Sequence, residues 1–348
     1  MSKKVFVGMS GGVDSSVTAA VLLEKGYEVE GINLVLTPND DAVGSRDAAA
    51  VAEKLGIPLH ILDLRDEFSK NVIDYFTEEY LKGRTPNPCI RCNESIKFGL
   101  LLDNALEMGA DFIATGHYAK IVHEFGRYKL KKSPSKKDQS YFLCRLTQGQ
   151  LQHTLFPMCE FEKEDTREIA EKYGLPVAQK ADSQEICFIP DDDYAKFIVE
   201  RTGITPPPGN FVDMQGNILG EHKGILYYTI GQRKGLGIAF GEPMFVTKID
   251  AKKNEILLAP QGNQHAKAFT VEKMNYISLD MPLTCEINAE VKIRCQAQPA
   301  PARIIPITAE KVKIEFETPQ RAITPGQAAV IYDGETVIGG GYIDEILV

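Results

Sequence analysis

The sequence lacks a long hydrophobic run and lacks an excess of positive charge. Nowhere in its 348 residues do about eighteen apolar residues follow one another, so we expect no membrane span. Lysine and arginine number 39 against 48 aspartates and glutamates, which gives a formal net charge of −9. This balance excludes a basic coat that binds nucleic acid everywhere, so any nucleic-acid contact must be local.

The sequence also lacks the features of a signal peptide and of a disulfide framework. The opening residues, MSKKVFVGMSGG, contain one short apolar run over 5–7, well below the core of a signal peptide. The seven cysteines are an odd number scattered through a long chain, which argues for reduced thiols. We therefore expect a cytoplasmic protein.

What the sequence does contain is the composition of a globular protein with several domains, 43% hydrophobic and 25% charged. In its first half, strand patterns alternate with helix patterns, a sequence typical of a parallel α/β sheet. The strands are expected over 4–9, 28–36, 59–64 and 112–115, and the helices over 15–25, 47–55 and 95–108. A later helix should start at Asp165, with Glu168 completing a capping box.

The second half changes character after three consecutive prolines at 206–208, which predict an extended linker. Beyond them helical spacing largely disappears, and residues 311–317 alternate as a half-buried strand does. Asp333-Gly334 is placed to form a two-residue hairpin turn. We expect an α/β catalytic domain over 1–200, a small β-rich domain over 201–266 and a C-terminal β-barrel over 267–348.

The strongest local signal is a glycine-rich loop that follows the first strand and precedes the first helix. Glycines let the backbone approach a ligand closely, and the amides that open the helix point toward an anion. The lysine of a Walker A loop is missing, whereas SGG-x-DS resembles the loop of the ATP pyrophosphatases. That likeness implies ATP binding, with serine hydroxyls on phosphate and Asp14 helping to hold Mg²⁺. A plain glycine turn capped by Ser10 is the alternative. The loop residues are Gly8, Met9, Ser10, Gly11, Gly12, Val13, Asp14 and Ser15.

A cysteine motif, NPCIRCN over 87–93, forms the second signal. Its two prolines are expected to stiffen a loop that presents Cys89 and Cys92 just before the 95–108 helix. Arg91, Lys97 and the helix N-terminus would favour a thiolate, a hypothesis that an unperturbed pKa of Cys92 would refute. Zinc binding and a thioredoxin-like pair are alternatives, although no second C-x-x-C supplies further zinc ligands.

A third motif, DSQEICFI over 182–189, places Cys187 among apolar residues, which taken alone is typical of a buried core thiol. Taken in order, however, the motifs are similar to those of the MnmA/TrmU family of bacterial tRNA-specific 2-thiouridylases. They are SGGVDSS, NPCIRCN, ATGHYAK over 114–120, KDQSYFL over 137–143, DSQEICFI and GQRKGLGI over 231–238. The resemblance covers nearly the whole chain and implies an N-terminal parallel-sheet PP-loop domain of the adenine nucleotide alpha hydrolase-like type, a central domain and a C-terminal barrel.

The resemblance also implies a reaction. ATP would adenylate O2 of the wobble uridine, U34, and release pyrophosphate, after which sulfur would replace that oxygen to give 2-thiouridine and AMP. Cys187 would carry the sulfur as a persulfide received from a cysteine desulfurase or a relay protein. Cys92 would act as the nucleophilic partner thiol and end in a disulfide with Cys187. Leu34 and Gly116 would contact adenine or ribose, although plain core and plain turn explain them equally well.

Contacts with tRNA are implied at several places. From the residues themselves, the run 120–137 holds seven basic side chains against Glu124 alone, and Arg233-Lys234 form a second basic site. A solvated charged hairpin is the alternative for the run. The resemblance adds Asn87, Pro88 and Cys89 at the target base, Lys137, Asp138 and Gln139 at the anticodon stem, and Arg294, Cys295 and Gln327 around the flipped uridine.

Two departures from the family leave alternatives open. Many members carry aspartate where this chain has Cys89, so Cys89, Cys92 and Cys187 together could hold an iron–sulfur cluster. Cys295 replaces an aromatic residue, which puts the contact of this position with the uridine in question.

A rival enzyme is another PP-loop tRNA-modifying synthetase, one that delivers nitrogen. A rival of a different class is a noncatalytic RNA-binding module with a decayed nucleotide site.

Overall fold

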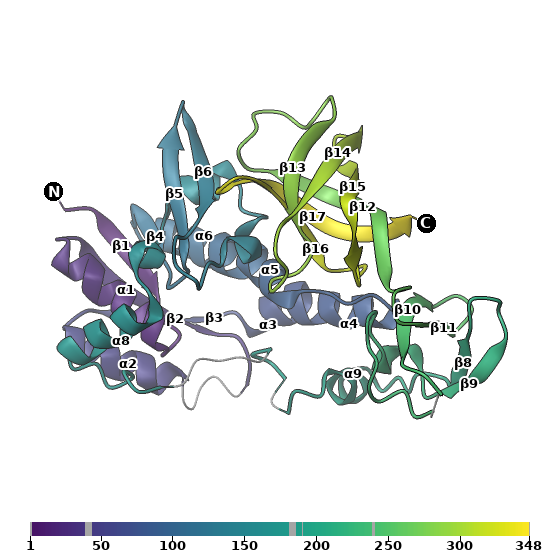
Figure 1. Cartoon of the computed structure of the whole chain (residues 1–348). Helices are drawn as coiled ribbons and strands as arrows, with labels where there is room; N and C mark the ends of the chain where they lie inside the picture. Colours follow the sequence, from purple (N-terminus) through teal and green to yellow (C-terminus); the bar gives the residue numbers. More distant parts are fainter. Residues whose placement is uncertain (1, 39–43, 181–185, 190, 239–240, 348) are drawn as a thin grey trace.

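The computed structural model describes residues 2–38, 44–180, 186–189, 191–238 and 241–347 (Figure 1). Its first sheet is parallel, with strand order β3-β2-β1-β4-β7. The parallel sheet expected from the alternating pattern is therefore confirmed. The strands are β1 (Lys4–Gly8), β2 (Glu28–Val35), β3 (Leu59–Asp63), β4 (Phe112–Ala114) and β7 (Thr154–Leu155).

Strand β1 is buried on both faces, because helices cover both sides of the sheet. Val5 and Val7 belong to one apolar cluster and Phe6, pointing the opposite way, belongs to another. The cluster of Val5 and Val7 is closed by α1 (Val13–Glu24), α2 (Gly44–Leu55) and α8 (Lys163–Lys172). Both predicted helices of this layer are present, with earlier starts.

The helix expected over 95–108 begins at Pro88, so the prediction of a loop at the cysteines is wrong. Asn87 caps it by accepting a hydrogen bond from the Ile90 amide at 3.3 Å, and Pro88 takes the first helical position. Cys89 and Cys92 therefore lie in the first turns of a helix. It consists of α5 (Pro88–Cys92), a π-helical stretch (Asn93–Leu100) and α6 (Leu101–Glu107).

The capping box of α8 is also displaced from the predicted one. Glu162 is the N-cap, and Asp165 sits at the third helical position, where its Oδ2 accepts the Glu162 amide at 2.9 Å. A box needs its acidic partner three residues after the cap, and the cap itself can be a glutamate. Asp165 is therefore the third helical residue of the box and not its cap, and Glu168 does not belong to the box.

A group of helices beside the sheet packs into one apolar cluster that includes Cys92 and Phe188. After α9, residues 203–208 form neither helix nor strand, in line with the linker that the three prolines predict. The helices are α3 (Arg65–Phe68), a π-helical turn (Ser69–Ile73), α4 (Asp74–Leu81) and α9 (Tyr194–Thr202). Short helical segments elsewhere are Ser140–Leu143, α7 (Gln148–Gln152), Pro157–Glu160 and Ile225–Tyr227.

The central region forms a small sheet of its own, with order β10-β11-β8-β9. Its strands are β8 (Gly209–Val212), β9 (Ile218–His222), β10 (Met244–Asp250) and β11 (Glu255–Pro260). Phe211, Val246 and Leu258 are buried in its separate core. A separate core is the mark of an independent structural unit.

The C-terminal region is an antiparallel barrel, closed where β12 pairs with β17. The predicted hairpin is present, but Asp333 pairs with Thr336, so Gly334 and Glu335 make the turn. The expected pair was one residue too early. The barrel strands are β12 (His265–Tyr276), β13 (Ile287–Lys292), β14 (Ala300–Thr308), β15 (Lys311–Arg321), β16 (Ala328–Asp333) and β17 (Thr336–Leu347).

The barrel is fixed to the α/β region through a shared core. The hairpin of β5 (Ala119–Glu124) and β6 (Arg127–Lys132) stands beside the barrel in Figure 1 and pairs with β17 at Lys131 and Thr336. One apolar cluster contains Phe6 and Phe98 together with Tyr332 and Tyr342 of the barrel. Of the helices in the described ranges, none has the length and apolar character to cross a bilayer.

Candidate active site

The glycine-rich loop lies where the sequence predicts, between β1 and α1 at the carboxyl edge of the parallel sheet. Gly12 is extended and caps α1, while Gly11 has a φ of +69°, which disfavours other residues. A Cβ at Gly11 would lie 2.6 Å from the carbonyl oxygen of Gly44 and 2.8 Å from the Asp47 side chain. Glycine is therefore required for α2 to approach the loop.

Hydrogen bonds hold the loop in shape. The Asn33 Nδ2 on the neighbouring β2 donates to the Met9 carbonyl at 2.7 Å. The Ser15 and Ser16 hydroxyls both donate to the Gly12 carbonyl, at 3.1 and 2.8 Å, and Ser15 Oγ also accepts the Ser10 amide. These bonds place the serine side chains at the start of α1, where the helix dipole favours an anion.

Asp14 forms the most connected group of the loop, with partners that the sequence did not reveal. Its Oδ1 accepts the Lys163 ammonium at 2.6 Å and the Tyr118 hydroxyl at 3.0 Å. The Lys163 side chain is only 11% exposed, so this cation is held at the entrance to the helix N-terminus. Lys180 donates to the Gly11 carbonyl at 3.0 Å and to Asp47 at 2.5 Å. Two lysines thus border the anion site.

Gly116 lies directly against the loop. A Cβ on it would come within 2.8 Å of Asp14 and 2.9 Å of the Ser15 amide, so only glycine allows this approach. Beside it, Thr115 Oγ1 lies 2.8 Å from His117 Nδ1, and burial holds the pKa of His117 well below its usual range. Leu34 is half-buried near the end of β2 and packs against two apolar clusters.

Cys92 is not an activated thiol in this arrangement. It is 8% exposed, and burial raises the pKa of its thiol to about 11, although the Lys97 charge opposes the shift. Arg91, expected to help, is engaged with Glu94 at 3.0 Å and with the Asn71 carbonyl. The hypothesis of a lowered Cys92 pKa is therefore wrong, because desolvation outweighs the one nearby cation.

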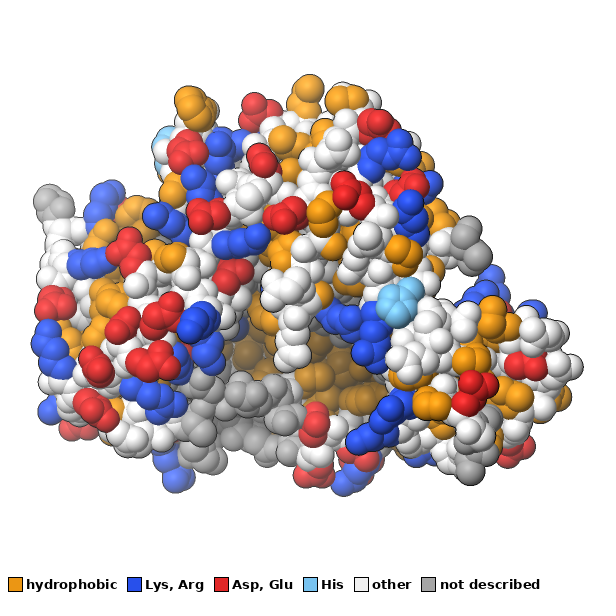
Figure 2. Space-filling view, in the orientation of Figure 1, with side chains coloured by type: hydrophobic (Ala, Val, Ile, Leu, Met, Phe, Trp, Pro, Cys, Tyr) orange, Lys and Arg blue, Asp and Glu red, His pale blue; other side chains and the backbone are white. Residues whose placement is uncertain are grey.

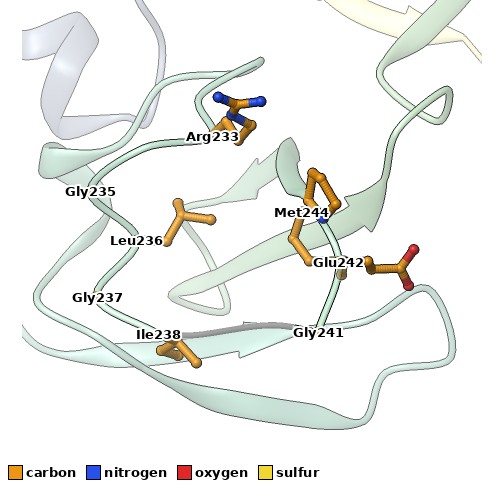
Figure 3. A pocket seen from close by; sticks show the side chains of 9 residues that line it. Arg233, Gly235, Leu236, Gly237, Ile238, Gly241, Glu242 and Met244 are labelled. Carbon is orange, nitrogen blue, oxygen red and sulfur yellow. The ribbon is translucent and has the colours of Figure 1, made fainter.

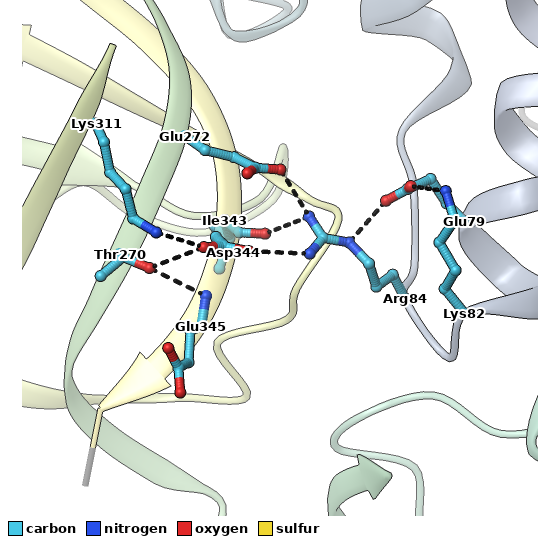
Figure 4. Close-up of polar contacts among 9 residues, drawn as sticks. All are labelled: Glu79, Lys82, Arg84, Thr270, Glu272, Lys311, Ile343, Asp344 and Glu345. Carbon is cyan, nitrogen blue, oxygen red and sulfur yellow. Dashed lines mark hydrogen bonds and ion pairs between the residues drawn. The ribbon is translucent and has the colours of Figure 1, made fainter. Parts of the chain in front are cut away.

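The lead into the cysteine helix is clamped to the barrel. The Thr85 amide donates to the Pro325 carbonyl at 2.9 Å, and Gln327 Nε2 donates to the Thr85 carbonyl at 3.0 Å. Arg84 connects the two regions, as Figure 4 shows. It bonds Glu79 at 2.7 Å, the Ile343 carbonyl at 3.1 Å and Asp344 at 3.3 Å. The clamp fixes the position of the cysteines relative to the barrel.

Cys187 is exposed, so the alternative of a buried core thiol is wrong. The next residue, Phe188, is buried against Phe68 and Phe76, with ring centroids 5.7 and 5.3 Å apart, and the Cys92 side chain belongs to the same apolar cluster. Cys187 itself lines a cavity of about 850 Å³. All seven cysteines lie in the described residues, and none of them forms a disulfide in this structure. Cys92 and the residues that flank Cys187 thus share one cluster, whereas the two thiols face different surroundings.

The residues predicted to meet tRNA are partly brought together. Burial raises the pKa of the Cys295 thiol, Lys292 opposes the shift, and Asp138 and Cys89 add to it, so these side chains lie within electrostatic range. Asp138 also shapes its own loop by accepting the Ser133 and Ser140 amides, at 3.0 and 3.1 Å.

The remaining predicted tRNA contacts have structural bonds of their own. Gln139 Oε1 accepts the Tyr118 amide at 3.1 Å, and Arg294 donates to the Arg321 carbonyl at 2.9 Å. Lys137 is exposed. Asn93, which the sequence did not single out, joins the cysteine helix to this loop through Nδ2 and the Phe142 carbonyl, at 3.0 Å.

The basic run proves to be the β5–β6 hairpin and the loop after it. Glu124 pairs with Lys129 at 3.2 Å and with Lys131 at 3.0 Å, so part of the positive charge is balanced within the hairpin. Lys120 and Lys136 are exposed. The second basic site borders a cavity of about 610 Å³ in the central region (Figure 3), where Arg233 and Lys234 are exposed and Leu236 is buried.

The donor sets differ in how well they suit a metal. A Mg²⁺ bound mainly through ATP phosphates needs one or two carboxylates, and the hydrogen bonds of Asp14 with described residues are made by its Oδ1. An iron–sulfur cluster needs several thiols at one point. Among the described residues, no three Cys, His, Asp or Glu side chains lie close enough to share an ion, and these residues include Cys89, Cys92 and Cys187. The three thiols do not fit a cluster in this arrangement.

Comparison with known proteins defines the class first. The tRNA methyl transferase HUP domain matches residues 3–191, the tRNA methyl transferase PRC-barrel domain matches 195–260, and the aminomethyltransferase beta-barrel domain matches 266–343. The parallel-sheet region with its anion loop is thus a HUP domain, followed by two β domains.

Relatives of the full length define the family. The tRNA-specific 2-thiouridylase MnmA of Acetivibrio thermocellus is 52% identical, over 98% of this chain and 99% of the relative. That of Clostridium acetobutylicum is 50% identical, over 99% and 100%, and that of Clostridioides difficile is 49% identical, over 100% and 99%. The chain belongs to the MnmA family of tRNA-specific 2-thiouridylases, which confirms the predicted family and fold class.

Proposed function

We propose that this protein is a tRNA-specific 2-thiouridylase that uses ATP to exchange the O2 oxygen of a wobble uridine, U34, for sulfur. The observation that carries the proposal is a preformed anion loop in the same domain as Cys92 and Cys187, where Cys92 and the residues that flank Cys187 pack into one apolar cluster. Relatives that match the whole chain at about half identity, 52% in Acetivibrio thermocellus, support the same reaction.

The first step overcomes a poor leaving group. A uracil carbonyl oxygen does not depart on its own, so O2 attacks the α-phosphate of ATP, pyrophosphate leaves, and the adenylated base then loses AMP. The amides at the start of α1 bind the phosphates, and the Lys163 and Lys180 ammonium groups add positive charge beside them. Leu34 and Gly116 border the adenosine. When bound, Mg²⁺ neutralises phosphate charge, and Asp14 would hold it.

The second step moves the sulfur. The terminal sulfur of a Cys187 persulfide attacks C2, AMP departs, and a disulfide links Cys187 to the base. The Cys92 thiolate then attacks the Cys187 sulfur, so that thiouridine leaves with the electron pair and a Cys92–Cys187 disulfide remains. Two thiols are oxidised as one sulfane sulfur is reduced, so the electrons balance. An external thiol must reduce the disulfide before the next turnover.

This assignment requires Cys92 to lose its proton despite its burial. Forming the disulfide brings the two sulfurs to about 2.05 Å, and departure of Cys92 from its apolar surroundings would lower its pKa toward the ordinary value. While Cys92 stays buried, its raised pKa makes its thiol a poor nucleophile.

The tRNA would lie across the face shared by the cysteine helix and the barrel. Closeness of Cys89, Asp138 and Cys295 supports a common binding surface. The full proposed set is Asn87, Pro88 and Cys89 at the target base, Lys137, Asp138 and Gln139 at the stem, and Arg294, Cys295 and Gln327 around the uridine. We also propose 1–200, 201–266 and 267–348 as the three domains, and a cysteine desulfurase or relay protein as sulfur donor.

The test compares the wild type with Cys92→Ser and Cys187→Ser in a reaction with tRNA, ATP-Mg and a persulfide source. Mass spectrometry of tRNA nucleosides measures 2-thiouridine, and a second assay measures pyrophosphate. Both variants should lose thiouridine by at least about 1,000-fold and still release pyrophosphate with tRNA. Cys285→Ser, at an exposed thiol of the barrel region, is the matched control and should match the wild type. A Cys187→Ser protein that makes thiouridine would refute the assignment.

A further inference from the structure

The cavity lined by Cys187 has the size of a ligand site. Its volume is about 850 Å³, within the roughly 300–1,000 Å³ of binding clefts, and its walls come from the end of β3, from α3 and from α9. Figure 2 shows that the molecule is hollowed between the α3–α4 row and α9, with hydrophobic side chains on the floor. Ile73, Phe188 and Phe197 contribute apolar surface to the cavity.

The rim of this cavity carries net negative charge. Its two arginines are neutralised, since Arg65 pairs with Asp63 at 2.6 Å and Arg201 pairs with Asp74 at 2.6 Å. The cavity is also lined by exposed acidic side chains that form no ion pair with any described residue. They are Asp66, Glu67 and Glu200. Such a rim repels RNA phosphates and attracts cationic groups.

Cys187 faces this cavity, whereas Cys92 belongs to the apolar cluster behind it. Phe188 is 6% exposed and its ring packs against Phe68, Phe76 and Phe197, which anchors the segment to the helices. Cys187 is exposed and lines the cavity, so its thiol lies on the cavity side. A sulfur added to Cys187 here would therefore form apart from the buried Cys92.

We propose that the cavity is the docking site of the sulfur donor, a protein segment whose persulfidated cysteine is flanked by lysine or arginine. This inference rests on the proposed role of Cys187. The Cys187 thiolate attacks the terminal sulfur of the donor persulfide, the donor sulfur–sulfur bond breaks, and the donor cysteine leaves as a thiolate that takes up the proton released by Cys187. Sulfur thus enters through an acidic opening that RNA does not use, and loading precedes contact with Cys92.

Synthetic peptides test the proposal on the full-length protein without ATP or tRNA. Three peptides of equal length carry a central cysteine persulfide with basic, neutral or acidic flanks, and mass spectrometry measures the sulfur gained at Cys187. At low ionic strength the basic peptide should load Cys187 at least about 10-fold faster than the acidic one. The difference should shrink in about 0.5 M salt, where surface charges are screened.

A triple variant, Asp66→Lys/Glu67→Lys/Glu200→Lys, should reverse the preference. Glu310→Lys/Glu317→Lys/Glu335→Lys changes the net charge equally at exposed barrel positions and should keep the wild-type preference. Equal loading by all three peptides, or a preference unaltered by the cavity variant, would overturn the docking site and leave the proposed function standing. Failure of every peptide to modify Cys187 would overturn both.

Discussion

The nucleotide loop and the pair of cysteines occupy one domain but differ in how far their chemistry is assembled. The loop is held from three sides, by Asn33 on β2, by Lys163 on α8 and by Lys180. Cys92 is buried and its pKa is raised to about 11, while Cys187 is exposed toward a different cavity. On the proposed function, phosphate binding would therefore be preorganised, whereas sulfur transfer would require the two thiols to meet.

The largest expected effect concerns the thiols themselves. Because burial raises the pKa of Cys92 from 9.0 to about 11, it holds about 100-fold less thiolate near neutral pH than an unburied cysteine, so iodoacetamide should label Cys187 much faster. Peptide mass spectrometry over a time course measures both rates. Because the raised pKa belongs to the folded protein, the two rates should converge in denaturant. Equal rates in the native protein would remove the distinction between the two regions.

Lys163→Met tests whether the nucleotide loop needs the ammonium group beside Asp14. Loss of the ammonium beside Asp14 should lower tRNA-dependent pyrophosphate release by about 100-fold, the typical cost of removing one preorganised electrostatic contact. Alkylation of Cys187 should not change. Lys172→Met, on the exposed side of the same helix, is the control and should behave as wild type. Normal pyrophosphate release in Lys163→Met would show that the loop works without this cation.

Arg84→Ala tests the clamp that joins the cysteine helix to the barrel (Figure 4). The side chain is 20% exposed and bonds Glu79 and Asp344, which would each keep only one cation among the described residues, Lys82 and Lys311. The free energy of unfolding should fall by about 2 kcal/mol, the scale of lost hydrogen bonds to charged groups, measured by denaturant titration. Arg303→Ala, at a pair whose arginine is 47% exposed, should cost below about 1 kcal/mol. Equal losses would assign Arg84 an ordinary surface role.

The smallest effect is the pH dependence of the same clamp. Burial opposes ionisation of Asp344, but hydrogen bonds from Lys311 and Arg84 outweigh it and hold its pKa below the usual value. A lowered carboxyl pKa contributes stability that is present above the unfolded pKa of about 3.9 and is lost as pH falls through the folded pKa. Asp344→Asn should therefore lower the melting temperature at pH 7 and have less effect at about pH 3. A constant difference would contradict the linkage.

Local sequence patterns were enough to predict the elements that short-range interactions determine. The parallel strands, the anion loop and the barrel follow from alternation, glycine spacing and hydrophobic periodicity. The start of the cysteine helix was also readable, because Asn87 followed by Pro88 is a standard cap and first position. It was missed because two prolines also suit a loop, and only packing distinguishes the two.

Long-range contacts could not be read in the same way. Lys163 pairs with Asp14, and Arg84 pairs with Asp344 in the barrel. The partners are far apart in sequence and share no motif. Apolar neighbours predicted burial for Cys187, yet Phe188 and Ile189 are buried in the cluster while Cys187 is exposed. The pKa of Cys92 depends on the helices packed around it, so the basic residues near it in sequence gave the wrong direction.

The most direct measurement follows one labelled sulfur through a single turnover. Cys187 is loaded with a ³⁴S persulfide, the donor is removed, and excess protein reacts with tRNA and ATP-Mg. The account predicts one ³⁴S in each 2-thiouridine formed and an equal amount of Cys92–Cys187 disulfide in the protein. Thiouridine without the label, or labelled thiouridine with both cysteines still reduced, would contradict it.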